Sequence, residues 1–294
     1  INGVHLSEAN IKKYIKLIKM NSKNNKIYFD LPGRKARLWY SKERRVVKRG
    51  TTFCVSGGEI YQGEKIYMTG WEEFTNAKER DILCIRRNQR ENVYLKVLCK
   101  QLSEMIVEVQ NDGILGWGYQ IYNVSNWVAG SGIAKDDEYY IDLLRNENID
   151  YVVVSFVDNA EMFLKYKKRL LSNNSNMEVY AKIETKEGMS NAEAILKECN
   201  GIVVGRDDMS MFYTSLEIQD NLDYLVELGK KYSKIVIPAS NYFTSLSNKE
   251  GLTEEEITNI KVLKYKGISE IYCNETSKYN GWKELARLQK DINK

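Results

Sequence analysis

A lysine, a glutamate and two aspartates are the side chains of this sequence best placed to do chemistry. Lys182 and Glu184 lie at the carboxyl end of the apolar run EVYAKI, and Asp207 and Asp208 closely follow the apolar run GIVVG. Carboxylate oxygens are the ligands that small hard cations such as Mg²⁺ prefer. A lysine beside them could stabilise negative charge that develops on a reacting group. The residue types therefore point to a metal site at which an anion reacts.

The strand expected at residues 178–183 would direct Lys182 and Glu184 to one site. Residues two apart on a strand project to the same face, so both side chains would point the same way. A lysine and a glutamate at this spacing are often only an exposed ion pair. The acidic residues after the next strand favour a shared site over that simpler interpretation.

The segment between these two runs predicts a strand, helix and strand unit. Gly188 is expected to lie in a turn, Ser190 to cap a helix, and the apolar residues of 192–196 to share its buried face. Gly201 is expected to end this helix and to begin a strand that is buried on both sides. Polar residues at the carboxyl ends of such strands are where α/β folds build their sites.

The same alternation of strand and helix extends over most of the chain. Ser7 is expected to cap a first helix whose buried face carries Ile11, Tyr14, Ile15 and Ile18. Six parallel strands are predicted, at residues 26–31, 151–156, 178–183, 201–205, 234–240 and 269–274. With residues 1–3 as the tail of a seventh strand, the fold class is α/β, a TIM-type (β/α)8 barrel whose first strand is missing from this chain.

Residues 38–124 have a different texture. Short β-prone runs, separated by Gly and Asn turns, predict a small all-β module; they lie at 45–49, 51–56, 65–69, 81–86, 92–99 and 104–110. The predicted domains are therefore a barrel domain of residues 1–37 and 125–294, and an inserted β-rich domain of residues 38–124.

Composition excludes several classes of protein. The 294 residues carry 44 Lys and Arg against 40 Asp and Glu, so the chain is not expected to bind nucleic acid or a membrane surface. No apolar run is long enough to span a membrane, and no signal peptide is visible. The five cysteines show no CxxC spacing, which favours reduced thiols in a cytoplasmic protein. Because it begins at Ile1, the chain is expected to be a processed or partial form.

Eight short motifs, in the same order along the chain, resemble those of the pyruvate kinase family. INGVHLS, DLPGRKAR and VQNDGIL resemble the family's RLNFSHG, DLQGPKIR and VENGGxL. YVVVSFV, AKIETKEGM and GIVVGRDD resemble FVAxSFV, SKIENxEG and GIMVARGD, while IPASNYFTSL and CNETSK resemble CATQMLESM and SGETAKG. The resemblance implies a TIM-type barrel with a β-rich lid inserted after its third strand. The family's separate carboxyl-terminal regulatory domain is expected to be absent.

The resemblance also implies roles for individual residues. Glu184 and Asp208 would hold a divalent ion, Mg²⁺ or Mn²⁺, which also binds the enolate and carboxylate oxygens of pyruvate. Lys182 would stand beside the transferring phosphoryl group, and Arg37 would contact phosphate. Ser240 occupies the position of a threonine near the methylene carbon of the substrate, and it keeps the hydroxyl group.

Further positions follow from the same resemblance. Asn2 and Asp30 match ligands of a monovalent cation, K⁺, and His5 matches the histidine of RLNFSHG. The residues expected to contact the substrate are Arg206, Asp207, Asp208 and Ser240. The implied small-molecule partners are phosphoenolpyruvate or pyruvate and ADP or ATP, and a homo-oligomer is expected.

Several working positions depart from the family pattern. Asp207 replaces the glycine of RGD, whose backbone N–H receives the pyruvate carboxylate, and Val4 replaces a serine of the cation site. Residues 84–88 stand where the family has an aspartate pair followed by glycine, and residues 118–119 where it has a nucleotide-binding lysine. SGET is shortened to NET. These changes affect the nucleotide half of the site more than the metal half.

Two alternatives to phosphoryl transfer therefore stay open. GRDDMS partly resembles the GPADLS of metal-dependent pyruvate-class aldolases, which share the barrel and the acidic pair. Those enzymes lack a β insert and use a catalytic histidine, for which this chain offers only His5. The altered lid also suits a non-catalytic descendant that uses the barrel for binding.

Overall fold

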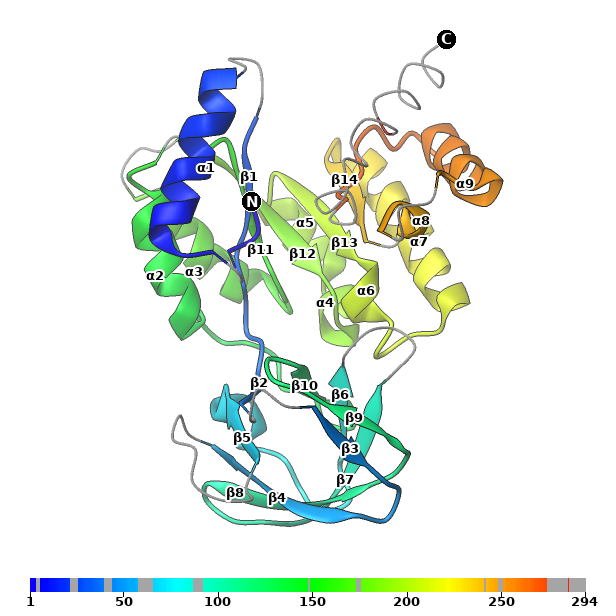
Figure 1. The fold of residues 1–294 in the computed structure, drawn as a ribbon. Helices are drawn as coiled ribbons and strands as arrows, with labels where there is room; N and C mark the ends of the chain where they lie inside the picture. The colour runs from blue at the N-terminus through cyan, green and yellow to red at the C-terminus, as the bar shows by residue number, and fades with distance from the viewer. Residues whose placement is uncertain are drawn as a thin grey trace. The chain divides into compact units, whose positions relative to one another are not determined.

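The computed structural model describes residues 1–3, 6–21, 26–39, 44–57, 66–86, 92–147, 149–172, 176–240, 242–247, 251–273 and 285. The chain divides into two compact units. The first, here called the α/β unit, comprises residues 1–33 and 130–294, and the second, the β unit, comprises residues 34–129 (Figure 1). The predicted domains, a barrel domain of residues 1–37 and 125–294 and a β-rich domain of residues 38–124, stay a prediction.

A parallel sheet of five strands forms the centre of the α/β unit, in the order β1-β11-β12-β13-β14. The strands are Tyr28–Asp30, Tyr151–Val154, Glu178–Ile183, Gly201–Gly205 and Ile235–Ala239. Their residues are almost entirely buried, as expected when both faces of a parallel sheet are covered. The mixed α/β fold predicted from the sequence is thus confirmed.

Single parallel bridges extend this sheet at both edges. Asn2 pairs with Asp30 beyond β1, and Tyr272 pairs with Ala239 beyond β14. The strand predicted at 269–274 is therefore wrong as a full strand, since the described part of it is reduced to the bridge at Tyr272. Closure into an eight-stranded barrel stays a prediction.

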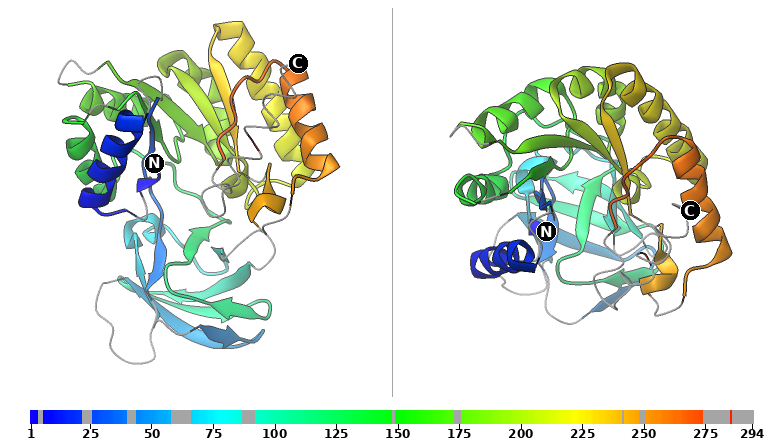
Figure 2. Two further views of the ribbon diagram at one scale, coloured as in Figure 1. Left: turned by 45° about the horizontal axis from the view of Figure 1, so that its top comes forward. Right: turned by 90° about the horizontal axis from the view of Figure 1, so that it is seen from above.

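The helices of the α/β unit cover the outer side of the sheet (Figure 2). In α1, Ile11 and Ile15 are buried as predicted, whereas Tyr14 is exposed. The expectation that Tyr14 shares the buried face is therefore wrong. The helices are α1 Glu8–Asn21, α2 Lys135–Leu144, α3 Ala160–Leu170, α4 Lys186–Ser190, α5 Ala192–Glu198, α6 Arg206–Met209, α7 Ser215–Tyr232, α8 Thr244–Ser247 and α9 Glu254–Tyr265.

The helix that follows β12 begins earlier than the sequence predicts. Thr185 is the N-cap of α4, and its side chain accepts a hydrogen bond from the Gly188 amide. Ser190 ends α4 and donates to the carbonyl of Lys186, so its expected role as an N-cap is wrong. A serine hydroxyl is equally satisfied by the carbonyl four residues earlier, which makes this cap ambiguous in sequence.

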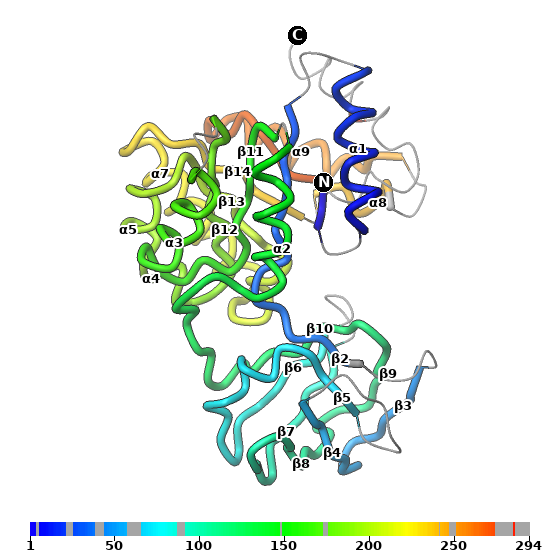
Figure 3. Tube along the Cα trace, turned by 90° about the vertical axis from the view of Figure 1, so that its left-hand side faces the viewer, coloured from blue at the N-terminus to red at the C-terminus, as the bar shows by residue number. Residues whose placement is uncertain are grey.

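The β unit is a small closed barrel in the strand order β10-β2-β5-β4-β8-β7-β6 (Figure 3). β3 and β9 form a separate two-stranded antiparallel sheet, and a short 3₁₀ helix, η2, lies between β5 and β6 in the sequence. The predicted β-prone runs coincide with β3 to β8, whereas β2, β9 and β10 escaped prediction. The elements are β2 Arg37–Trp39, β3 Arg45–Val47, β4 Thr52–Gly57, β5 Ile66–Thr69, η2 Trp71–Phe74, β6 Ile82–Arg86, β7 Val93–Lys100, β8 Glu104–Val109, β9 Gly113–Leu115 and β10 Gln120–Asn123.

Asp137 is a fully buried carboxyl group on α2. It accepts hydrogen bonds from the Gly33 amide, at 3.0 Å, and from the Tyr166 hydroxyl, at 2.7 Å. Burial raises the pKa of Asp137 to about 6, although both hydrogen bonds favour the ionised form. The folded chain therefore holds this proton more tightly than the unfolded chain does.

A raised carboxyl pKa stabilises the fold at low pH and loses that contribution as the pH rises. We expect the free energy of unfolding of the native protein, measured relative to Asp137→Asn, to fall by about 2 kcal/mol between roughly pH 4 and pH 7. Urea unfolding of both proteins across that range measures it. A difference that does not change with pH would contradict the assignment.

No helix in the described part of the chain is both long and apolar enough to cross a bilayer.

Candidate functional site

Lys182 lies in a cluster of carboxylates at the carboxyl end of the parallel sheet. Its Nζ lies 3.3 Å from Oε1 of Glu184, which directly follows β12, and 3.4 Å from Oδ2 of Asp30 at the end of β1. Lys182 and Asp30 are almost completely buried, and Glu184 is completely so. The prediction that Lys182 and Glu184 share a face is confirmed, and burial excludes the simple exposed ion pair.

Glu184 is fixed in its orientation from two sides. Its Oε2 accepts a hydrogen bond of 2.7 Å from the amide of Phe156, which follows β11. Gly205, the last residue of β13, provides the space: a Cβ atom there would lie 2.4 Å from Cγ of Glu184 and 2.9 Å from its Oε1. Neighbouring strands on both sides thus hold this carboxylate in place.

Several carboxylates act electrostatically on Lys182. Burial by itself would lower the pKa of Lys182, but the carboxylates of Asp30, Glu184 and Asp208 raise it well above its usual value. The ammonium group therefore stays charged throughout the physiological range. Three carboxylates among the described residues thus act on the one ammonium group of Lys182, and a group of carboxylates is chemically suited to a further cation.

Two residues beside the cluster have left-handed backbones. Phe156 has φ of 55° after β11, and Ser240 has φ of 68° after β14. Such conformations cost non-glycine residues about 1–3 kcal/mol each and concentrate at functional sites. Both residues lie at the carboxyl ends of sheet strands, where α/β folds place their sites.

The residues predicted to contact the substrate lie at the same end of the sheet. Arg206, Asp207 and Asp208 belong to the short helix α6 that follows β13. Arg206 donates to the carbonyl of Ser240, at 3.4 Å, and its guanidinium lies 4.1 Å from the ring centroid of Tyr242. These contacts bring Arg206 and Ser240 together.

The remaining predicted residues lie further along or in the other unit. Asn2 is exposed and pairs with Asp30 through the backbone bridge at the sheet edge. Arg37 belongs to β2 of the β unit and donates to the carbonyl of Gly118, at 2.9 Å. Val4, His5, residues 87–88 and residues 274–276 fall outside the described residues.

The donor chemistry of the cluster fits a small hard cation. Among the described residues, no group of three or more His, Cys, Asp and Glu side chains is arranged to hold a metal. Mg²⁺ commonly uses only one or two protein carboxylates and takes its other ligands from water and substrate. Glu184 and Asp208 are therefore suitable residues to hold it.

The sequence did not single out the groups that support this cluster. The Ser155 hydroxyl donates to Oδ1 of Asp30, at 3.1 Å, and the Tyr272 hydroxyl lies 3.5 Å from Oδ2. The Phe156 amide is a third such group. Ser155 directly follows the wholly apolar run YVVV, and a polar residue in that position is the signal that could have found it, whereas Phe156 acts through its backbone amide and gives no such signal.

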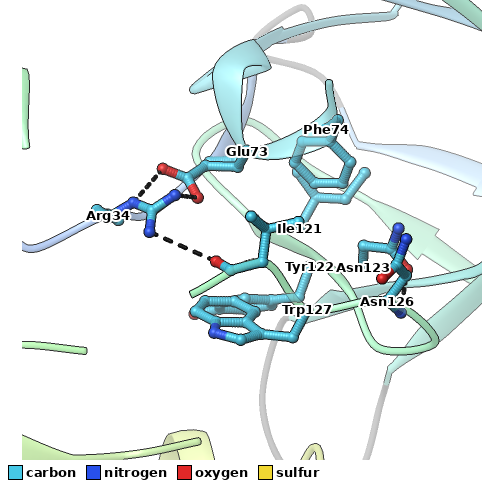
Figure 4. Close-up of a pocket in the computed structure, with 10 residues that line it drawn as sticks. Arg34, Glu73, Phe74, Ile121, Tyr122, Asn123, Asn126 and Trp127 are labelled. Atoms are coloured by element: carbon cyan, nitrogen blue, oxygen red, sulfur yellow. Dashed lines mark hydrogen bonds and ion pairs between the residues drawn. The ribbon is translucent and has the colours of Figure 1, made fainter. Parts of the chain in front are cut away.

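A separate small pocket lies within the β unit (Figure 4). Arg34 forms an ion pair with both carboxylate oxygens of Glu73 and donates to the carbonyl of Val128, at 3.4 Å. The rings of Tyr122 and Trp127 pack together, with centroids 6.4 Å apart. The site residues predicted from the sequence are not among those that line this pocket.

Comparisons with known proteins identify relatives across nearly the whole chain. The family model described as "Pyruvate kinase, barrel domain" matches residues 4–268. The pyruvate kinase of Thermotoga maritima is 26% identical over 254 residues, which cover 85% of this chain and 54% of that protein. The pyruvate kinase of Methanocaldococcus jannaschii is 25% identical over 266 residues, which cover 90% and 56%. That of Staphylococcus saprophyticus is 24% identical over 288 residues, which cover 97% and 49%.

The matches cover most of this chain but only part of each relative. The chain spans about half the length of the curated relatives it matches, at low identity. The family match nevertheless includes both described units and every strand of the parallel sheet. The chain therefore belongs to the pyruvate kinase family.

Proposed function

We propose that this chain catalyses metal-dependent phosphoryl transfer between phosphoenolpyruvate and a nucleotide, or a divergent acceptor. The observation that carries the proposal is the buried Lys182, held among Asp30, Glu184 and Asp208 at the carboxyl end of the sheet. The named relatives are pyruvate kinases, which supports this reaction class for the chain.

In this proposal Lys182 supplies a fixed positive charge. Phosphoryl transfer involves little covalent chemistry by the protein, so its rate depends mainly on positioning and on charge stabilisation. A raised pKa keeps Lys182 protonated, and its contacts with Asp30 and Glu184 limit where its ammonium group can lie. A divalent ion at Glu184 and Asp208 would offset the charge on the carboxylate and enolate oxygens of the substrate.

Other parts of the proposal come from the family pattern. Arg206 and Ser240 would contact the substrate beside Asp208, and Arg37 would contact phosphate. Asn2 and Asp30 would bind K⁺. ADP or ATP would be the nucleotide, and the protein would act in the cytoplasm as a homo-oligomer.

Asp207 is the residue that most opposes the ordinary reaction. It lies on α6 between Arg206 and Asp208, and its carbonyl accepts a hydrogen bond from the Ser210 hydroxyl. A negative side chain in place of glycine would repel the carboxylate of phosphoenolpyruvate if it faced that group. Weak binding of this substrate is therefore expected.

The direct test measures pyruvate formation from phosphoenolpyruvate and ADP. We expect turnover in the presence of Mg²⁺, its loss when EDTA removes the metal, and its recovery with Mn²⁺, because hard oxygen ligands accept either ion. Asp207→Gly belongs in the same assay, with a lower KM for phosphoenolpyruvate expected. Turnover that is insensitive to EDTA would contradict the metal requirement, and no turnover with any nucleotide would exclude the kinase reaction.

Enolisation of pyruvate without a nucleotide is the second candidate. The cluster of Lys182, Glu184 and Asp30 lies wholly within the α/β unit, so enolate chemistry needs no residue of the β unit. Incorporation of solvent deuterium into the pyruvate methyl group, without phosphoryl transfer, would favour a lyase or aldolase. Lack of both reactions and of Mn²⁺ binding would favour a non-catalytic protein.

A further inference from the structure

The chain leaves the α/β unit after Gly33 and returns to it at Gly130. Each of these glycine amides donates a hydrogen bond to a different buried carboxylate of the α/β unit, Asp137 and Asp158. We propose that Asp137 and Asp158 are positioning residues. They fix Gly33 and Gly130, here called the two crossings, and connect them to Ser155 and Thr185, which adjoin the Lys182 cluster. The catalytic part of this inference rests on the proposed function.

The first crossing is held tightly against the end of β11. Oδ1 of Asp137 accepts from the Gly33 amide at 3.0 Å, and Gly33 has φ of 69°. A Cβ atom on Gly33 would lie 2.7 Å from Cβ of Ser155, so the two residues are in direct contact. The Ser155 hydroxyl in turn donates to Asp30, which faces Lys182.

At the second crossing, both the amide and the carbonyl of Gly130 are hydrogen-bonded to side chains. Oδ2 of Asp158 accepts from the Gly130 amide at 3.0 Å, and the side-chain amide of Asn159 donates to the Gly130 carbonyl at 3.1 Å. Oδ1 of Asp158 accepts from the hydroxyl of Thr185, which directly follows Glu184. Asp158 is completely buried, as is Thr185.

Both crossings connect to a residue that adjoins the cluster. Gly33, held by Asp137, packs directly against Ser155, whereas Gly130 is connected to Thr185 through Asp158. A displacement of either crossing would therefore move a support of Asp30 or Glu184. Misplacement by about 1 Å can cost catalysis about 100-fold.

Hydrogen exchange of the native protein gives the first test, because it needs no substrate. Amides in loops usually exchange rapidly, whereas those of Gly33 and Gly130 should be protected as strongly as neighbouring strand amides. Residue-resolved exchange by NMR measures this. Unprotected Gly33 and Gly130 amides would overturn the proposal even if no variant folds.

Alanine variants with a matched control give the second test. Asp137→Ala and Asp158→Ala should accelerate exchange at their own crossing about tenfold, and Asp158→Ala should also accelerate exchange of the Phe156 amide that holds Glu184. Glu256→Ala is the control, since Glu256 is also buried and accepts from the amides of Ser245 and Thr253 far from either crossing in sequence. Equal acceleration in the control variant would overturn the proposal.

Conservative variants separate positioning from general stability. Asp137→Asn and Asp158→Asn keep an oxygen that can accept from the glycine amide, so they should restore protection. In the phosphoenolpyruvate assay the alanine variants should lower kcat about tenfold with little change in KM, and the asparagine variants should recover most of it. Loss of protection with unchanged kcat would overturn the connection to the cluster. If the native protein shows no turnover, the proposed function fails. The exchange measurements still decide whether Asp137 and Asp158 fix the two crossings.

Discussion

Replacement of Lys182 by methionine is expected to reduce phosphoryl transfer by at least about 1000-fold, the range measured when a charge-stabilising group is removed from such reactions. Methionine has nearly the same length and fills the same buried space, so the loss should reflect charge. Steady-state turnover of phosphoenolpyruvate and ADP measures it. Activity within tenfold of the native protein would exclude Lys182 as the charge-stabilising group.

The same variant should also be less stable. Removal of the ammonium group leaves the carboxylates of Asp30 and Glu184 facing each other across a buried site, and breaking a buried ion pair typically costs about 3–5 kcal/mol. A divalent cation should return part of that stability if it binds the cluster. Urea unfolding with and without Mg²⁺ measures both effects.

A surface lysine provides the control for Lys182→Met. Lys19 on α1 pairs with Asp150 at 2.9 Å, and both side chains are partly exposed. Lys19→Met should change the free energy of unfolding by less than about 1 kcal/mol and leave turnover unchanged, because exposed ion pairs contribute little. Equal losses of stability and turnover from Lys19→Met and Lys182→Met would show that the buried ion pairs of Lys182 contribute no more than an exposed one.

Gly205→Ala is expected to give the second large effect. Its Cβ atom would lie 2.4 Å from Cγ of Glu184, a distance at which one of the two must move. The backbone is not the obstacle, since φ of −81° suits alanine. We expect a loss of about 3 kcal/mol of stability from overpacking. Displacement of Glu184 should lower turnover about 100-fold.

Gly132→Ala tests whether that effect comes from contact with Glu184. Gly132 lies in the same unit, and a Cβ atom there would meet no other atom within 4 Å. Its replacement should be neutral to within about 0.5 kcal/mol, as for most uncrowded surface positions. If Gly205→Ala changes stability and turnover as little as Gly132→Ala, then Gly205 does not pack closely on Glu184.

Local pattern predicted the parts of this site that lie close together in sequence. The period of two along a strand placed Lys182 and Glu184 on one face, and their distance confirms it. Ser190 was expected to cap the helix at residues 192–196, but the N-cap of that helix is Asn191, and the short helix α4 capped by Thr185 was missed; Ser, Thr and Asn all cap helices, and only packing distinguishes them.

Contacts between distant segments could not be predicted from local pattern. The pairing of Asp30 with Lys182, and of the Phe156 amide with Glu184, depends on the strand order of the sheet and on a left-handed backbone at Phe156. Family resemblance drew attention to Asp30, but for a monovalent cation. The strands β2, β9 and β10, of three or four residues each, are too short for a period to be recognised.

The insertion of a closed barrel between β1 and β11 has a consequence for how the chain folds. These strands pair in parallel although about 120 residues separate them, so their association closes a long loop. Within the β unit, Arg34 contacts the carbonyl of Val128, which brings the two ends of the insert together. Once the barrel has formed, about 24 residues, helix α2 among them, remain in that loop, which lowers the entropic cost of closing it by about 1.4 kcal/mol. Folding of the insert before the sheet would therefore lower the entropic cost of pairing β1 with β11.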